Sequence, residues 1–279
     1  MAAPKDWREA NRVLWDERVA VHLAPGGYDV ESLRAGRARL NAIEERELGP
    51  VKGLRALHLQ CHFGRDSLIL AQRGAAEVVG LDFSKPAVDT ANTLAAEMKL
   101  PARFVQADLY DAPEAIPEPA SFDLVFTTWG TIGWLPDIRG WARIVAHFLK
   151  PGGVLYLADG HPAALVLDDS VPFPDGRPGF FAPYFEREPV VCQATTDYVN
   201  ETAKLVNTTE YSWMHPLGET VTALIDAGMR LDWLHEHPTV TWRMFKSLVK
   251  IADGTYSWPD KPWLPLAFSL KATRVQTSS

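Results

Sequence analysis

The stretch LHLQCHFGRDSLILAQRGAAEVVGLDFS, residues 57–84, reads as an apolar strand, a loop, a helix and a second apolar strand that ends in Asp82. This order is typical of the βαβ unit that opens nucleotide-binding folds. The loop is normally rich in glycine, but here it reads QCHFG (60–64). Because the side chains of Gln60 and His62 would crowd a pyrophosphate, the loop disfavours a dinucleotide and suits a ligand that has no pyrophosphate.

The same alternation of strands and helices continues on both sides of this stretch. Apolar strands are expected at 55–59, 77–81, 102–106, 122–128 and 154–158, and helices at 65–73, 86–98, 113–116 and 137–149. Strands without polar alternation that are separated by helices predict a doubly wound α/β fold, in which helices cover both faces of a parallel sheet.

Both ends of the chain add further elements to this pattern. An amphipathic helix is expected at 5–23, and a second helix at 31–48 that ends at Gly49-Pro50. Beyond a proline-rich loop, segments 190–199 and 204–213 favour an antiparallel hairpin. The segment GETVTALIDAGMR predicts a helix that stops at Gly228, and two strands with an aromatic loop between them are expected at 231–237 and 266–273.

Composition limits the classes of function. The net charge of −7 disfavours general binding to nucleic acid or to anionic membranes. No apolar run reaches the length of a membrane-spanning helix, and the N-terminal residues are too charged for a signal peptide. The two cysteines, Cys61 and Cys192, exclude a disulfide framework and favour a cytoplasmic protein, and no pattern predicts a metal site.

Two acids follow consecutive strands. Asp82 closes the second strand, where a carboxylate can accept both hydroxyls of a ribose. Helix capping is the alternative role for Asp82, but Ser84 already stands before Lys85-Pro86 as the expected cap. Asp108 follows the third strand, where it either accepts the amine of an adenine or forms a turn. The pair predicts an adenosine site.

With these segments in place, residues 54–158 resemble a class I S-adenosylmethionine-dependent methyltransferase. The segment LHLQCHFGRDSL stands at the glycine-rich first motif, VVGLDFS at the ribose motif, QADLYD at the adenine motif, FDLVFTTWGTIGWLPD at the fourth motif and LKPGGVLYLAD after it. The resemblance implies a mostly parallel seven-stranded sheet with an antiparallel last strand. It also implies an N-terminal helical cap at 1–50 and a Rossmann-like domain at 51–279 that carries an inserted substrate lid at 160–216.

The resemblance implies S-adenosylmethionine as cofactor and a set of cofactor-binding residues. Those that match the family's motifs or lie in the cap are Tyr28, Gln60, Cys61, His62, Gly64, Asp82, Phe83, Asp108, Leu109, Thr128 and Trp129. Trp129 and Trp134 could attract a sulfonium through their ring faces, although packing against the following helix is favoured for Trp134. The departure from the family is the first motif, which has side chains where glycines are usual.

The implied reaction is an in-line methyl transfer that depends on positioning the reactants and excluding water, with a base needed only for an acceptor of high pKa. His161 and His215 are the candidate bases, and the candidate acceptor-pocket residues are Trp134, Tyr184, Tyr211 and Trp213. The expected acceptor is the oxygen or nitrogen of a small apolar or aromatic molecule. A non-catalytic S-adenosylmethionine-binding protein and a nicotinamide-dependent oxidoreductase are the alternatives. The oligomeric state, including a homodimer, is left open.

Overall fold

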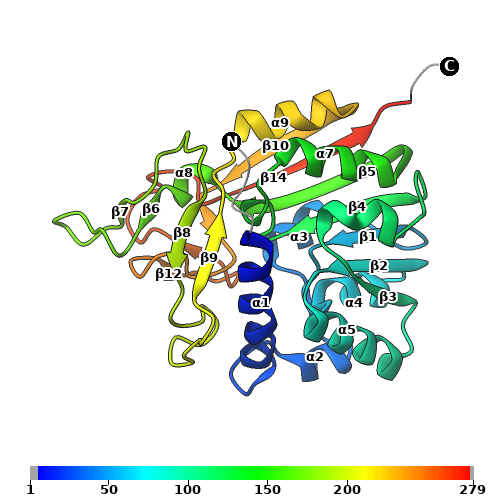
Figure 1. The fold of residues 1–279 in the computed structure, drawn as a ribbon, viewed down its shortest axis with the longest axis horizontal. Helices are drawn as coiled ribbons and strands as arrows, with labels where there is room; N and C mark the ends of the chain where they lie inside the picture. Colours follow the sequence, from blue (N-terminus) through cyan, green and yellow to red (C-terminus); the bar gives the residue numbers. More distant parts are fainter. Residues whose placement is uncertain (1–5, 277–279) are drawn as a thin grey trace.

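The computed structural model describes residues 6–276, and a seven-stranded sheet forms its centre (Figure 1). The strands are β1 (Arg55–Leu59), β2 (Glu77–Asp82), β3 (Ala102–Gln106), β4 (Phe122–Thr128), β5 (Leu149–Gly160), β10 (Met229–His237) and β14 (Ala267–Arg274). Their order is β10-β14-β5-β4-β1-β2-β3. The pairs among β1 to β5 are parallel, whereas β14 is antiparallel to β5 and to β10. This arrangement confirms the expected sheet with an antiparallel last strand.

Helices cover both faces of this sheet, which explains why its strands read as apolar runs. On one face lie α4 (Arg65–Gln72) and α5 (Lys85–Met98), and on the other lie α7 (Ile138–Phe148) and α9 (Leu217–Asp226), with the short α6 (Ala112–Ala115) (Figure 1). Between the sheet and the second group of helices, Trp141 and Phe148 of α7 and Phe122 of β4 are fully buried in one apolar cluster. No helix within residues 6–276 has the length and apolarity needed to cross a bilayer.

The N-terminal region differs from the expectation after its first helix. Helix α1 (Trp7–Leu23) agrees with the expected helix, whose residue 5 lies outside the described residues. The single helix expected at 31–48 is wrong, because two short helices, α2 (Val30–Arg34) and α3 (Ala42–Glu47), occupy this segment. Gly36, at φ +68°, takes a left-handed conformation that ends the first of them.

The segment between β5 and α9 contains α8 (Pro162–Leu165), the paired strands β6 (Leu167–Asp168) and β7 (Gly179–Phe180), and the hairpin strands β8 (Val190–Gln193) and β9 (Thr209–Ser212). The hairpin is antiparallel as expected, but its strands are shorter than expected. It packs on α1, which lies between it and the sheet (Figure 1). Asn11 and the backbone of Tyr211 form two hydrogen bonds of 2.9 Å, which tie the helix to the hairpin.

A small sheet was not expected from the sequence. Between β10 and β14, the strands β11 (Thr239–Val240), β12 (Val249–Lys250) and β13 (Tyr256–Ser257) form a three-stranded antiparallel sheet. Each strand has two residues, which is too short for an alternating pattern to show. The sheet packs around Val240, Phe245 and Trp258 in a separate apolar cluster.

Candidate active site

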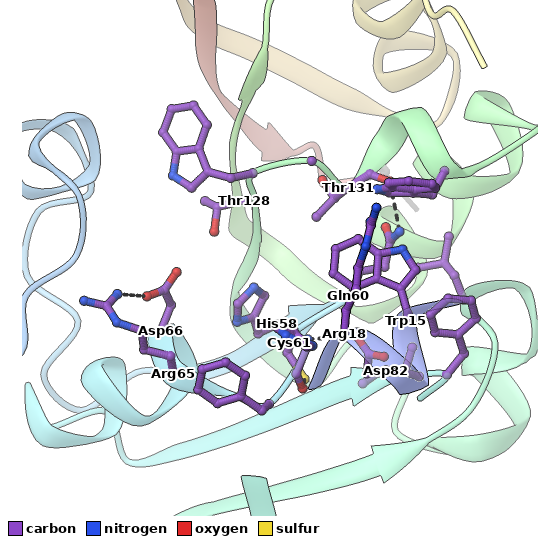
Figure 2. A pocket seen from close by; sticks show the side chains of 18 of the residues that line it. Trp15, Arg18, His58, Gln60, Cys61, Arg65, Asp66, Asp82, Thr128 and Thr131 are labelled. Atoms are coloured by element: carbon purple, nitrogen blue, oxygen red, sulfur yellow. Dashed lines mark hydrogen bonds and ion pairs between the residues drawn. The ribbon is translucent and has the colours of Figure 1, made fainter. Parts of the chain in front are cut away.

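A cavity of about 800 Å³ lies at the carboxyl ends of β1, β2, β3 and β4 (Figure 2). Open parallel sheets bind their ligands at this edge. Residues of α1, of the inserted hairpin and of the segment after β11 complete its wall, among them Trp15, Tyr198 and Trp242. Segments far apart in the sequence therefore enclose one space beside the sheet.

The first carboxylate of this cavity is Asp82, the last residue of β2. Its Oδ2 accepts a hydrogen bond from the backbone N–H of His62 (2.7 Å), and its Oδ1 accepts one from that of Ser84 (2.9 Å). The residue is 7% exposed, and burial raises its pKa to about 6 against the lowering effect of these bonds. Asp82 is thus a buried acceptor aimed at the cavity, which suits a ligand with neighbouring hydroxyl groups. Ser84 caps α5 by accepting from Ala87, so Asp82 has no capping role.

The second carboxylate, Asp108, lines the same cavity with its neighbour Leu109. The backbone N–H of Ala107 donates to the carbonyl of Asp82 (3.0 Å), so the two strand ends are adjacent. Asp108 Oδ1 accepts from the backbone N–H of Tyr110 (2.9 Å) and lies 3.3 Å from an Arg8 nitrogen. Burial raises the pKa of Asp108, and Arg8 opposes that effect. The turn role and the ligand role of Asp108 are compatible in this geometry.

The unusual loop after β1 keeps the backbone of a glycine-rich loop. Gln60 (φ +57°) and His62 (φ +51°) both take the left-handed conformation that glycine adopts without cost. For other residues it costs about 1–2 kcal/mol each, so the fold sustains this strain at the cavity. Gln60 Nε2 donates to the carbonyl of Thr131 (2.9 Å) and joins this loop to the one after β4. Cys61, between the strained residues, also lines the cavity, and burial holds its pKa well above the usual thiol value.

Gly64, an expected cofactor-binding residue, has a packing role in the structure. It precedes α4 with φ +76° and does not line the cavity. A Cβ at Gly64 would lie 2.5 Å from the Phe104 ring, so glycine lets α4 approach β3 closely.

The loop after β4 is held by one buried carboxylate, Asp159 at the end of β5. Asp159 accepts from the backbone N–H groups of Gly130 (2.6 Å), Thr131 (3.0 Å), Ile132 (3.2 Å) and Gly160 (2.7 Å), and from the Thr131 hydroxyl (3.2 Å). Thr128 and Trp129, which precede this loop and line the cavity, therefore have a fixed orientation.

Trp129 contacts the N-terminal region. Its Nε1 donates to Glu44 Oε1 (2.6 Å), which also accepts from Asn41 Nδ2 (3.1 Å). Glu44 is fully buried, and burial raises its pKa to about 8, with a further contribution from nearby Asp66. A largely protonated carboxyl group at neutral pH thus fixes the indole of Trp129 in the cavity wall.

Aromatic rings and one guanidinium form the wall opposite the sheet. The Arg18 guanidinium carbon lies 4.9 Å from the ring centre of Trp15, 5.9 Å from that of Trp134 and 5.8 Å from that of Tyr198. Arg18 is 5% exposed and pairs with Glu210 (3.2 Å). Trp134 therefore faces the cavity and Trp15, rather than packing only on α7.

Three enclosed polar atoms on the cavity floor have no hydrogen-bond partner within residues 6–276. They are His58 Nε2, Gln60 Oε1 and Thr128 Oγ1. Buried polar groups are rarely left unpaired, and because these atoms are enclosed, a ligand reaches them only when the neighbouring side chains shift. Asp82 and Asp108 at the adjacent strand ends are the cavity groups that fit a nucleoside.

Other expected site residues fall into two groups. Tyr28 and Phe83 line the cavity, and the Tyr28 hydroxyl lies 3.3 Å from that of Tyr198. The two expected bases do not line it. His161 caps α8 by accepting from Ala163 N–H (3.1 Å) and lies 3.0 Å from Glu236, whereas His215 Nε2 lies 2.7 Å from the carbonyl oxygen of Leu135.

Three expected acceptor residues are also absent from the cavity lining. The Tyr184 hydroxyl accepts from the backbone N–H of Leu217 (3.1 Å), Tyr211 is bound to Asn11 of α1, and the ring of Trp213 packs on that of Trp7 at 5.3 Å. These contacts, of which the one at Tyr211 is made by its backbone, attach the inserted segment to its neighbours. The cavity residues without a sequence signal are those of α1 and the hairpin, above all Trp15, Arg18, Tyr198 and Glu210.

The sheet order, the antiparallel last strand and the paired strand-end carboxylates define a class I S-adenosylmethionine-dependent methyltransferase fold. Comparison with known proteins agrees with this fold. Residues 56–153 match the sequence model of a methyltransferase domain. Thus the family resemblance seen in the sequence holds for the part of the chain that runs from β1 to the start of β5.

Relatives agree with this class. The ubiquinone biosynthesis O-methyltransferase of Leptothrix cholodnii is 31% identical over 120 residues, which cover 43% of this chain and 49% of the relative. The chain spans about half the length of the curated relatives that it matches.

Solved structures share the fold at low sequence identity. A Mesorhizobium loti S-adenosylmethionine-dependent methyltransferase is 21% identical, with a TM-score of 0.56 over 83% of this chain and 96% of that one. A Methanosarcina mazei SAM-dependent methyltransferase is 19% identical, with a TM-score of 0.55 over 86% and 100% of the two chains.

Proposed function

We propose that this chain transfers a methyl group from S-adenosylmethionine to an oxygen atom of a small apolar or aromatic molecule. The observation that carries the proposal is the pair Asp82 and Asp108, which lie at adjacent strand ends and line one cavity. In this proposal Asp82 accepts the ribose hydroxyls and Asp108 the adenine amine. The named O-methyltransferase relatives support oxygen as the acceptor atom.

The cofactor, when bound, supplies a methyl group already activated by a sulfonium. The protein's own contribution is then to hold the two reactants in line and to exclude water. The loop after β4, fixed by Asp159, and the wall formed by Trp15, Trp134 and Trp242 suit this role because they are rigid and apolar. Aromatic rings on this wall also suit a flat apolar acceptor.

The polar tail of the cofactor is assigned to the part of the cavity between β1 and β4, which polar residues such as Gln60 and Thr128 line. His58 lies beneath it, and burial lowers the pKa of His58 to about 3, so its ring stays neutral. The crowded loop at Gln60 and His62 argues against a nicotinamide dinucleotide, whose pyrophosphate needs close approach to the backbone.

The test is an assay of methyl transfer from radiolabelled S-adenosylmethionine to a panel of phenols. We expect wild type to label at least one phenol, and Asp82→Asn to lower the rate about tenfold or more at limiting cofactor, since a charged hydrogen bond is worth about 1.5–3 kcal/mol. The matched control is Asp89→Asn, an exposed acid on α5 that pairs with Lys85. Equal rates for the two variants would contradict the assignment of Asp82.

A further inference from the structure

Two histidines from distant parts of the sequence meet beside the cavity. His22 Nδ1, near the end of α1, lies 2.8 Å from His62 Nε2 in the loop after β1. On its other side, His22 Nε2 lies 3.1–3.2 Å from both carboxylate oxygens of Asp197 in the inserted segment. His22 and Asp197 are 0% and 1% exposed, so the chain Asp197–His22–His62 runs from the protein interior to the cavity wall.

With both histidine rings neutral, the hydrogen bonds are compatible with the following placement of the protons. Asp197 accepts, because its pKa is lowered chiefly by His22 against the effect of burial, so His22 carries its proton on Nε2. His22 Nδ1 then has a lone pair, and the proton between the rings belongs to His62 Nε2. Neutral His62 consequently has its lone pair on Nδ1.

That lone pair is open to a ligand. His62 Nδ1 makes no hydrogen bond with the described residues and is not among their enclosed polar atoms, while the His62 ring lines the cavity. The rings of Trp15, Tyr28 and Phe63 surround the pair edge to face at 4.9–6.3 Å, which limits the access of water to it.

We infer that His62, backed by His22 and Asp197, is the base that takes the proton of a hydroxyl acceptor in this cavity. The inference rests on the proposed function and narrows its acceptor to a molecule with a protonated hydroxyl group. His62 touches the acceptor and is the catalytic residue, whereas His22 and Asp197 are positioning residues.

The step balances without a further reactant. The acceptor oxygen forms its bond to the methyl carbon as the carbon–sulfur bond breaks, and the electron pair of that bond stays on sulfur. The acceptor proton goes to His62 Nδ1, and the Nε2 proton shifts toward His22 Nδ1. The resulting positive charge lies next to the Asp197 carboxylate, which stabilises it. An amine acceptor attacks through its free lone pair and needs no such base at this step.

The charged and titratable groups around His22 and His62 can accommodate one proton added to this pair of rings. The side chains that face the two rings from the neighbouring elements are Arg18, Asp197, Tyr28 and Tyr198. Arg18 lies 3.5 Å from Asp197. Burial and the neighbouring His22 lower the pKa of His62 to about 3, which disfavours a charge that rests on His62 and requires the added proton to pass to His22 beside Asp197.

The first test reads the proton positions by ¹⁵N NMR of the histidine rings in the full chain with S-adenosylhomocysteine. We expect His62 to carry its proton on Nε2 in wild type, and Asp197→Asn to abolish that preference. The matched control is Asp175→Asn, an exposed acid of the same segment that pairs with Arg177 and lies outside the cavity lining. A proton on His62 Nδ1 in wild type, or no change in Asp197→Asn, would overturn the inference.

The second test compares two acceptors at about pH 8, phenol itself, which stays protonated, and para-nitrophenol, which is already ionised. We expect His62→Gln to lower kcat/KM for phenol about 10²- to 10³-fold but for para-nitrophenol less than about threefold. Equal losses would show that His62 only shapes the site, and transfer to neither phenol by wild type would refute the hydroxyl acceptor. If wild type labels para-nitrophenol but His62→Gln loses kcat/KM equally for both acceptors, only this inference is refuted. If the chain does not bind S-adenosylhomocysteine, the proposed function itself is refuted.

Discussion

Asp159→Ala is the substitution that tests most sharply how the cavity keeps its shape. The change deletes the one carboxylate that accepts from the backbone N–H groups of four residues, Gly130, Thr131, Ile132 and Gly160. Asp159 is 4% exposed, so these donors lose a buried partner. An unmade buried hydrogen bond costs about 1–3 kcal/mol. Since water from the adjacent cavity can satisfy some donors, we expect a total loss of about 3–5 kcal/mol.

The loss is measurable as a fall in the thermal midpoint. For 279 residues, an unfolding entropy of about 2.1 cal/mol/K per residue converts about 3–5 kcal/mol into a fall of about 5–9 °C. The control is Asp137→Ala, which removes one backbone hydrogen bond, the cap of α7 in which Asp137 Oδ1 accepts from the backbone N–H of Gly140 (2.8 Å), worth about 1 kcal/mol and about 2 °C. Circular dichroism melts of the two variants decide the point. The reasoning is refuted if Asp159→Ala melts no lower than Asp137→Ala.

Three further substitutions or conditions give distinct outcomes. Because burial raises the pKa of Asp82 to about 6, we expect the Kd of S-adenosylhomocysteine by calorimetry to rise about tenfold per pH unit below about 6, and a flat profile would contradict this. Gly64→Ala should lower the free energy of unfolding in urea by about 2–4 kcal/mol, because the added Cβ meets Phe104. The control Gly152→Ala, at φ +82° in open space, should lower it by about 1–2 kcal/mol. Equal losses in the two variants would argue against the packing role of Gly64. Burial raises the pKa of Glu44 to about 8, so the stability that Glu44 gives is present below its unfolded pKa of about 4.5 and is lost as the pH rises through 8. The free energy of unfolding of Glu44→Gln should therefore match that of wild type near pH 4 and exceed it by several kcal/mol at pH 9. Parallel pH profiles of the two proteins would exclude a buried acid.

Much of the fold was predictable because buried parallel strands read as apolar runs. The strands at 55–59 and 77–81 pair in register over five residues, as their uninterrupted apolar sequence suggests. The helix expected at 31–48 failed because Gly36 adopts a left-handed conformation that an Arg- and Glu-rich pattern does not reveal. The small sheet between β10 and β14 has strands of two residues, below the length at which periodicity carries information.

The candidate site was predictable only where the sheet itself supplies it. Asp82 and Asp108 follow strands, so their neighbourhood can be read from the sequence. Arg18 and Tyr198 reach the cavity because α1 docks on the inserted hairpin, and long-range packing of this kind leaves no local pattern. The same docking brings His22 to His62, whereas His161 lies at a helix cap outside the cavity.

The most direct test of the central claim, that the cavity beside β1 and β2 holds an adenosine, is calorimetric titration of the purified chain with S-adenosylhomocysteine and, separately, with NAD⁺. The account predicts saturable heat for S-adenosylhomocysteine, a Kd at least about tenfold higher in Asp82→Asn, and no heat for NAD⁺. Heat from NAD⁺ alone, or an unchanged Kd in Asp82→Asn, would contradict it.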